Sequence, residues 1–306
     1  MTRGNRPGEK AYLGGGLRLD ERVRTTARTP IFDNHIHLRA EFQGVAAAKA
    51  FERAGGTAML LTHTPYDEVP IGRGEDFEAA YRKTLSMADA VRATTTLQVF
   101  VALGPYPVEF LALRDAIGPE AAVEAMQQGI DEAARHIAEG RAIAFGEIGR
   151  PHFAVAADAI SACNDLLEYA MRSAKGLGCA VVLHTEDPTP QTFAEIVEIA
   201  SRAGLAADRV VKHHSTPFTR PEDTHGVVPS ILAKEELVKM ALRGSPRFLL
   251  ETDYIDDPRR PGAVLGPATV PRKTRAWLER GVLREDDAWW IHKDLPERTY
   301  GIELRE

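Results

Sequence analysis

Short apolar runs and longer amphipathic segments alternate along the chain. Eight apolar runs recur, and glycine, proline or polar residues bound each of them. They lie at residues 31–38, 57–63, 97–104, 142–149, 179–185, 209–214, 225–230 and 247–253, of which 225–230 is the weakest. Runs this short and this continuously apolar are typical of strands in a parallel sheet that is covered on both faces. We therefore expect eight buried parallel strands.

The segments between these runs are rich in alanine and repeat their apolar residues with a helical period, as in AAYRKTLSMADAVRA and AISACNDLLEYAMRSAKGLG. Several end at a glycine suited to a helix C-cap: Gly55, Gly140, Gly176 and Gly204. Strand–helix alternation predicts a single-domain α/β protein, a (β/α)8 TIM barrel over residues 30–306. A doubly wound open sheet is the alternative. Residues 1–29 are polar and glycine-rich and form an N-terminal extension.

Composition narrows the class of protein. With 306 residues, of which 44% are hydrophobic, the chain can bury a large core. It has no apolar run of about 18 residues, and MTRGNRPGEKAYLGGG lacks the apolar stretch of a secretion signal, so we expect a soluble, cytoplasmic protein without a membrane partner. A formal net charge of −6 gives no general attraction to nucleic-acid phosphates. Cys163 and Cys179 are expected in the core, without a disulfide.

Histidines gather where the predicted strands end. Seven of the ten close a strand or follow it within a few residues: His35, His37, His63, His152, His184, His213 and His214. His136 and His292 lie in helical patterns, and His225 lies in a loop or at a strand start. Because the carboxyl ends of barrel strands meet at one rim, where catalytic groups collect, these seven imidazoles are candidates for a shared site.

The motif HIH ends the first strand. Residues i and i+2 of a strand point to the same face, so His35 and His37 project together into the barrel mouth and can share one cation. Asp33 and Asn34 form a polar break just before them. The H-x-H pattern alone is common by chance, and its weight depends on partners farther along the chain.

Carboxylates end two other strands. Glu147 lies between two glycines in AFGEIG, where a buried carboxylate is costly unless it is paired in a salt bridge or bound to metal. A carboxylate that bridges two cations is the sharper alternative. Glu251 and Asp253 in FLLETD share a face by the strand period, so spacing does not assign them separate roles.

Together these residues resemble the ligand set of the TatD family of metal-dependent hydrolases, within the amidohydrolase superfamily and closest to its archaeal-type members. GPYP and LPERTYGI are weaker matches. The chain departs from the family where Tyr106 in GPYP replaces a usual histidine, where RPHF follows GEIG in place of Leu-Asp-Tyr, and in the loop ETDYIDDPRRPGAVLGP. The resemblance therefore supports the catalytic machinery better than any substrate.

The resemblance implies two divalent cations, whose identity could be Zn, Mn, Co, Ni or Mg. The implied ligands of one are His35, His37, Glu147 and Asp253. Those of the other are Glu147, His184 and His213, with His214 as the alternative to His213. Asp253 would also take the proton from the attacking water. A mononuclear site is the alternative.

The implied activity is hydrolysis of a phosphoester or of a carboxylic ester or amide by a metal-activated water. Alternatives are a 3′–5′ exonuclease or DNase, a small-molecule lactonase or esterase, and a non-catalytic metal-binding barrel. We expect a small-molecule or phosphoester substrate, with nucleic acid not favoured by the net charge. Predicted substrate contacts are Arg150, His152, His63 and Tyr106. Basic residues expected on the same rim are Arg150, Lys212, Arg220, Arg259 and Arg260.

Overall fold

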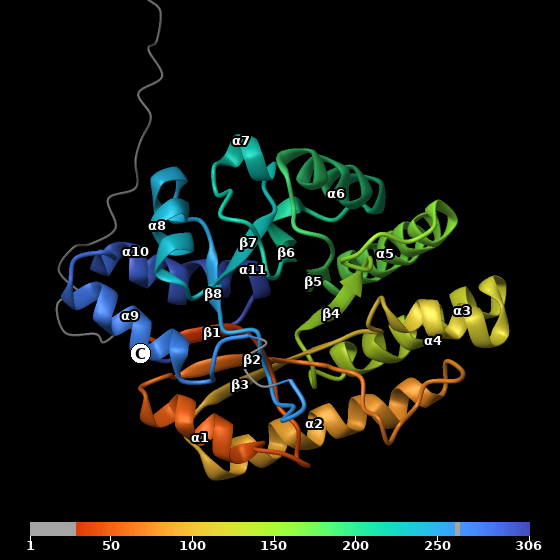
Figure 1. Ribbon diagram of the computed structural model, residues 1–306, viewed down its shortest axis with the longest axis horizontal. Coiled ribbons are helices and arrows are strands. Elements are labelled where there is room, and N and C mark those ends of the chain that lie inside the picture. The colour runs from red at the N-terminus through yellow and green to blue at the C-terminus, as the bar shows by residue number, and fades with distance from the viewer. Residues whose placement is uncertain (1–28, 261–263) are drawn as a thin grey trace, which may run out of the picture.

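The structure, a computed structural model, describes residues 29–260 and 264–306. The predicted N-terminal extension, apart from residue 29, lies outside the described residues. Within them the order of elements alternates between strands and helices, and the helices lie around the sheet (Figure 1).

Eight predicted strands are present, and a short ninth follows them. They are β1 (Phe32–His37), β2 (Ala58–Thr62), β3 (Gln98–Leu103), β4 (Ala144–Gly149), β5 (Ala180–His184), β6 (Val210–Lys212), β7 (Val228–Leu232), β8 (Leu249–Glu251) and β9 (Tyr254–Ile255). Neighbours in the order β8-β7-β6-β5-β4-β3-β2-β1-β9 pair in parallel. The weak run at 225–230 was placed too early. His225 caps the short helix α7 in a left-handed conformation, with φ 49°, and β7 begins three residues later.

The first and last parts of the sheet meet, which closes the barrel. The Asp253 N–H donates to the His35 carbonyl at 3.0 Å, and β9 pairs with β1 immediately afterwards. Below this junction, the backbone and hydroxyl of Thr252 both donate to the Asp33 carboxylate, at 3.0 and 2.7 Å. The predicted (β/α)8 barrel is confirmed, and the doubly wound open sheet is wrong because its edge strands would not meet.

Helices follow the strands and cover the outside of the barrel. They are α1 (Val45–Arg53), α2 (Asp76–Thr94), α3 (Glu109–Ile117), α4 (Pro119–Ala138), α5 (Ala157–Leu177), α6 (Pro190–Ala203), α7 (Pro221–Thr224), α8 (Glu235–Gly244), α9 (Thr269–Glu279), α10 (Glu285–Trp289) and α11 (Leu295–Tyr300). A short 3-10 helix, η1 (Ala207–Arg209), and a short π-helix, η2 (Trp290–Asp294), complete the set in the described residues. Gly204 caps α6 as predicted. The predicted end of α5 at Gly176 is wrong by two residues, because Gly178 takes the left-handed cap conformation.

The inward face of each strand changes from apolar to polar towards the carboxyl end. In β5 this face carries the buried Ala180 and Val182 and then His184. The lower layers thus form an apolar plug, while the polar groups meet at the upper rim. Cys163 and Cys179 are free and buried, as predicted. None of the helices in the described part of the chain has both the length and the apolarity needed to cross a bilayer.

A buried histidine on the floor of the barrel makes stability depend on pH. His292 is fully buried; its Nδ1 lies 3.2 Å from the Phe32 backbone nitrogen and its Nε2 lies 3.0 Å from the Thr274 hydroxyl. Burial lowers the pKa of His292 from 6.5 to about 4, so the unfolded chain takes up a proton at a higher pH than the folded chain. Stability should fall as the pH drops from 6.5 to about 4, by roughly 3 kcal/mol from this residue.

Urea unfolding at pH 7 and pH 4.5 tests this expectation with His292→Asn. The variant should lose part of the pH dependence, because its amide does not titrate. His225→Asn, at an exposed histidine, is the matched control and should keep the full dependence. An equal pH dependence in the wild type and His292→Asn would contradict the assignment.

Candidate metal centre

Strand β1 delivers two imidazoles to one point. The Nε2 atoms of His35 and His37 lie 3.1 Å apart, and both side chains are buried. His37 Nδ1 lies 2.9 Å from the Thr62 carbonyl oxygen. A carbonyl can only accept, so this nitrogen carries the proton and Nε2 presents its lone pair to the cavity. Such an outer hydrogen bond is the usual way in which a ligating histidine is oriented.

Local packing explains the glycines around Glu147. A Cβ on Gly146 would lie 2.9 Å from Cβ of Val182 in the neighbouring strand. At Gly149, where φ is +134°, a Cβ would lie 2.3 Å from the His184 carbonyl oxygen. Only glycine fits at either position without displacing β5. The sequence GEIG therefore lets β4 approach β5 closely and projects Glu147 into the barrel mouth.

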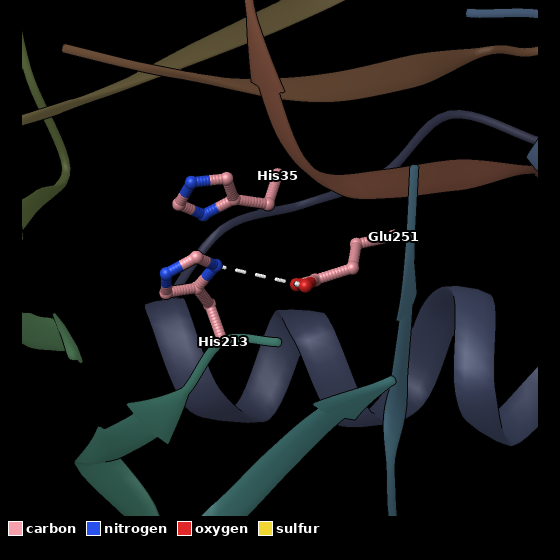
Figure 2. Close-up of side chains that lie close together, drawn as sticks. All are labelled: His35, His213 and Glu251. Carbon is pink, nitrogen blue, oxygen red and sulfur yellow. Dashed lines mark ion pairs between the residues drawn. The ribbon is translucent and has the colours of Figure 1, made fainter. Parts of the chain in front are cut away.

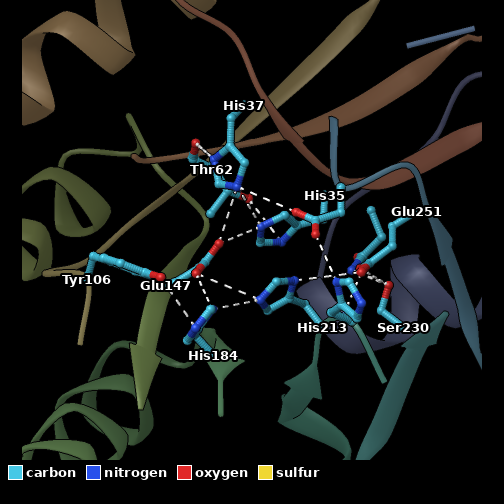
Figure 3. Close-up of polar contacts among 12 residues, drawn as sticks. His35, His37, Thr62, Tyr106, Glu147, His184, His213, Ser230 and Glu251 are labelled. Carbon is cyan, nitrogen blue, oxygen red and sulfur yellow. Dashed lines mark hydrogen bonds and ion pairs between the residues drawn. The ribbon is translucent and has the colours of Figure 1, made fainter. Parts of the chain in front are cut away.

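The two oxygens of Glu147 face two different pairs of imidazoles (Figure 3). Oε1 lies 2.7 Å from His35 Nε2 and 3.3 Å from His37 Nε2. Oε2 lies 2.8 Å from His184 Nδ1 and 3.7 Å from His213 Nε2. Burial opposes ionisation of Glu147, but the imidazoles of His213 and His184 outweigh it and hold its pKa well below the usual range. An ionised carboxylate thus lies between two sets of nitrogen donors.

Asp253 completes the side occupied by the β1 histidines. It follows the end of β8 in a left-handed conformation, with φ 49°, and its Oδ1 lies 3.8 Å from His37 Nε2. Its other oxygen lies 2.9 Å from Nδ1 of His214. Burial raises the pKa of Asp253, but the hydrogen bond from His214 and the neighbouring imidazoles lower it below the usual value. His214 is half-exposed, whereas His213 is buried against Glu147.

Glu251 is fully buried and lies beside His35 and His213 (Figure 2). Its Oε1 accepts the His214 N–H at 2.6 Å and stands 3.6 Å from His213 Nδ1, while its Oε2 accepts the Ser230 hydroxyl. The rings of His35 and His213 stack on each other, with their centroids 4.0 Å apart. His35, His213 and Glu251 are themselves close enough to hold an ion. Both Glu251 oxygens already accept hydrogen bonds, which favours a supporting role.

The charge of the cluster favours cations. Burial lowers the pKa of His35, but its hydrogen bond to Glu147 outweighs this and raises it to about 9. Burial and the neighbouring His35 keep the pKa of His213 well below its usual value. Glu147 and Asp253 are therefore ionised, and the imidazoles beside them differ in how strongly each binds a proton. Six donors of the kind that bind divalent transition metals meet here, so the residues fit the metal site that the sequence predicts.

A cavity of about 480 Å³ opens above this cluster. Of the four predicted substrate contacts, three line it: His63, Tyr106 and His152. His152 Nδ1 lies 2.9 Å, and the Tyr106 hydroxyl 3.4 Å, from His184 Nε2. Arg150 is not among the described lining residues, because its buried guanidinium pairs with Glu186 beside the barrel mouth.

The basic residues predicted on the rim differ in where they lie. Lys212 is buried, and its Nζ donates to the His213 carbonyl. Arg259 and Arg260 line the cavity, whereas Arg220, at the start of α7, is exposed outside the described lining. Sequence reasoning missed Arg39, which follows β1, lines the cavity and lies 5.3 Å above the ring of Tyr66.

A (β/α)8 barrel that gathers imidazoles and carboxylates at the carboxyl ends of its strands is typical of hydrolases that depend on divalent cations. Comparison with known proteins supports this class. The sequence profile of a family described as TatD related DNase matches residues 32–301. The chain belongs to this TatD family, as the sequence motifs predicted.

Individual relatives agree with the family assignment. A protein of Methanocaldococcus jannaschii, described as uncharacterized, is 35% identical over 281 residues, which cover 90% of this chain and 97% of the relative. The TatD-like protein of Archaeoglobus fulgidus superposes with a TM-score of 0.57 at 18% identity, covering 89% of this chain and 100% of that structure. A mutant PTE-like lactonase of Deinococcus radiodurans gives 0.59 at 17% identity, covering 90% and 97%. The two structural likenesses concern the fold.

Proposed function

We propose that the protein is a hydrolase that uses two divalent cations to cleave ester bonds with water. The observation that carries this proposal is the placement of Glu147, whose two oxygens face separate pairs of imidazoles. One cation would be held by Oε1 with His35, His37 and Asp253. The other would be held by Oε2 with His184 and His213.

The donor set restricts the metal. Imidazole nitrogens and carboxylate oxygens suit zinc, manganese, cobalt or nickel better than calcium. Divalent cations at such a site make water nucleophilic at neutral pH and polarise the oxygen of the scissile bond. We propose zinc as the first metal to test.

Asp253 is the residue that we propose for proton transfer. Its Oδ1 is directed towards His37 and the cluster, while the His214 Nδ1 bond at 2.9 Å fixes its other oxygen. Its lowered pKa keeps it ionised, ready to accept a proton from the attacking water and return it to the leaving group. His63, Tyr106 and His152 would contact the substrate from the cavity wall.

A cavity of about 480 Å³ suits a small-molecule ester. One observation favours a second candidate, a phosphodiester of single-stranded nucleic acid. Phe42, Phe153 and Phe218 are exposed large apolar residues that follow β1, β4 and β6, so they lie on the rim loops. Exposed aromatic rings can stack on bases, although the acidic chain opposes binding of a long polyanion.

The proposal is tested by removing metal with a chelator, restoring zinc or manganese, and measuring release of 4-nitrophenol from carboxylic and phosphoric esters. We expect hydrolysis that disappears with the chelator and returns with metal. Hydrolysis that survives complete metal removal, or no hydrolysis of any ester by the metal-loaded protein, would contradict the proposal.

Glu251→Gln should weaken metal binding without unfolding the protein. The amide oxygen can still accept the His214 N–H, but the negative charge 3.6 Å from His213 Nδ1 is lost. We expect zinc affinity, measured by competition with a chromogenic chelator, to fall roughly 10–100-fold. Glu198→Gln, on the exposed face of α6, is the matched control. Unchanged affinity in Glu251→Gln would remove the supporting role from Glu251.

A further inference from the structure

The arginines around the cavity differ in what they already bind. Arg259 donates to the carboxylates of Asp257 and Asp67, with the closest distances 2.8 and 2.7 Å. Arg39 is buried, and its guanidinium donates to the Pro65 carbonyl and lies over the Tyr66 ring. The guanidinium groups of Arg259 and Arg39 therefore already hold neighbouring loop residues, although Arg39 Nε has no hydrogen-bond partner among the described residues.

Arg260 is different. Its backbone N–H donates to the Asp257 carbonyl at 3.0 Å, which anchors the residue after β9. Its side chain is exposed and forms no ion pair or hydrogen bond with another described residue. It lines the cavity above the metal-ligand cluster and also a neighbouring cavity of about 420 Å³. An uncommitted guanidinium therefore borders the proposed substrate site.

Arg260 lines the same cavity as two side chains on the wall beside His184. The Tyr106 hydroxyl lies 3.4 Å, and His152 Nδ1 lies 2.9 Å, from His184 Nε2. Tyr106, His152 and Arg260 supply hydroxyl, imidazole and guanidinium donors to one cavity.

We propose that Arg260, with Tyr106 and His152, forms a subsite for a second anionic group of the substrate, a carboxylate or phosphate separate from the scissile bond. This inference rests on the proposed hydrolase function and names its substrate class. A guanidinium binds either anion through paired hydrogen bonds. Asp67 and Asp257 on the same wall form their ion pairs with Arg259 and not with Arg260.

Two pairs of substrates with one leaving group test the subsite. The carboxylate arm compares 4-nitrophenyl acetate with mono-4-nitrophenyl succinate. The phosphate arm compares thymidine 5′-(4-nitrophenyl phosphate) with and without a 3′-phosphate. Arg260→Gln should lower kcat/KM for the more anionic member of at least one pair by roughly tenfold or more, mainly through KM, the size expected for one charge-assisted hydrogen bond. The arm that responds identifies the anion.

Arg243→Gln, at the exposed end of α8, removes the same charge at a position away from the cavity. It should leave kcat/KM unchanged for both pairs of substrates. Calorimetric titration with inorganic phosphate and succinate gives a readout without turnover, and at least one should bind about tenfold more weakly to Arg260→Gln. If Arg260→Gln lowered kcat/KM equally for both members of each pair, and bound phosphate and succinate as tightly as the wild type, the subsite proposal would be overturned. Failure of the wild type to hydrolyse any of the four esters, with anion binding still dependent on Arg260, would instead overturn the hydrolase function alone.

Discussion

Replacing Glu147 by glutamine should abolish binding of both cations and lower hydrolysis by roughly a thousandfold or more, which corresponds to about 4 kcal/mol of lost transition-state stabilisation. The substitution keeps the shape of the side chain between Gly146 and Ile148 but removes the charge that faces all four imidazoles. Since both proposed cation positions share this carboxylate, loss of its charge weakens both.

Metal analysis of dialysed protein and thermal unfolding with and without zinc measure this effect independently of activity. Zinc should raise the unfolding temperature of the wild type but not of Glu147→Gln, because only a ligand that binds the folded state stabilises it. The exposed variant Glu198→Gln should behave as the wild type. Retention of a full metal complement by Glu147→Gln would rule out the bridging role.

Replacing Asp253 by asparagine should lower kcat by roughly 10²–10⁴-fold, the range for loss of a general base. The amide can still accept the bond from His214, so the loop after β8 should keep its position. We expect part of the metal to remain, because the His184 and His213 side of Glu147 is untouched. The measurement is kcat at saturating metal, with metal content determined on the same sample.

His225→Asn is the control and should keep the kcat and metal content of the wild type, because His225 is exposed at the end of α7. A kcat of Asp253→Asn within about tenfold of the wild type would assign proton transfer to another group. Loss of all metal from Asp253→Asn would contradict the expectation that the His184 and His213 side of Glu147 keeps its cation.

The barrel was predictable because its signal is spread over the whole chain. Each buried strand must be short and apolar, and each crossover must carry a helix, so seven of the eight runs coincide closely with strands. The weak run at 225–230 contains polar and turn-forming residues, and there the position was wrong. The short strand β9 has only two residues, Tyr254 and Ile255, and depends on pairing with β1 rather than on a local pattern.

The clustering of imidazoles and carboxylates was predictable to the extent that strand period and strand ends determine the direction of side chains. His35 and His37 share a face, and Glu147 lies in the GEIG motif, where packing permits only glycine at positions 146 and 149. The separation of Glu251 from Asp253 was not predictable, because the chain leaves the strand at Glu251 and Asp253 then turns to the rim with φ 49°. The prediction that Glu251 and Asp253 share a face assumed that the strand continues to Asp253, but β8 ends at Glu251.

Side-chain pairing was the least predictable feature. Arg150 follows β4 directly, yet its guanidinium turns to Glu186 on the next loop. Arg260 is one residue from Arg259, but only Arg259 reaches the carboxylates of Asp257 and Asp67. Such pairings depend on which loops meet in space. A single sequence without relatives carries no signal for them.

Anomalous diffraction at the zinc edge, from crystals of metal-loaded protein, tests the central claim most directly. The account predicts two peaks, one on either side of Glu147, the first among His35, His37 and Asp253 and the second beside His184 and His213. A single peak among His35, His213 and Glu251, or no peak at the barrel mouth, would contradict it.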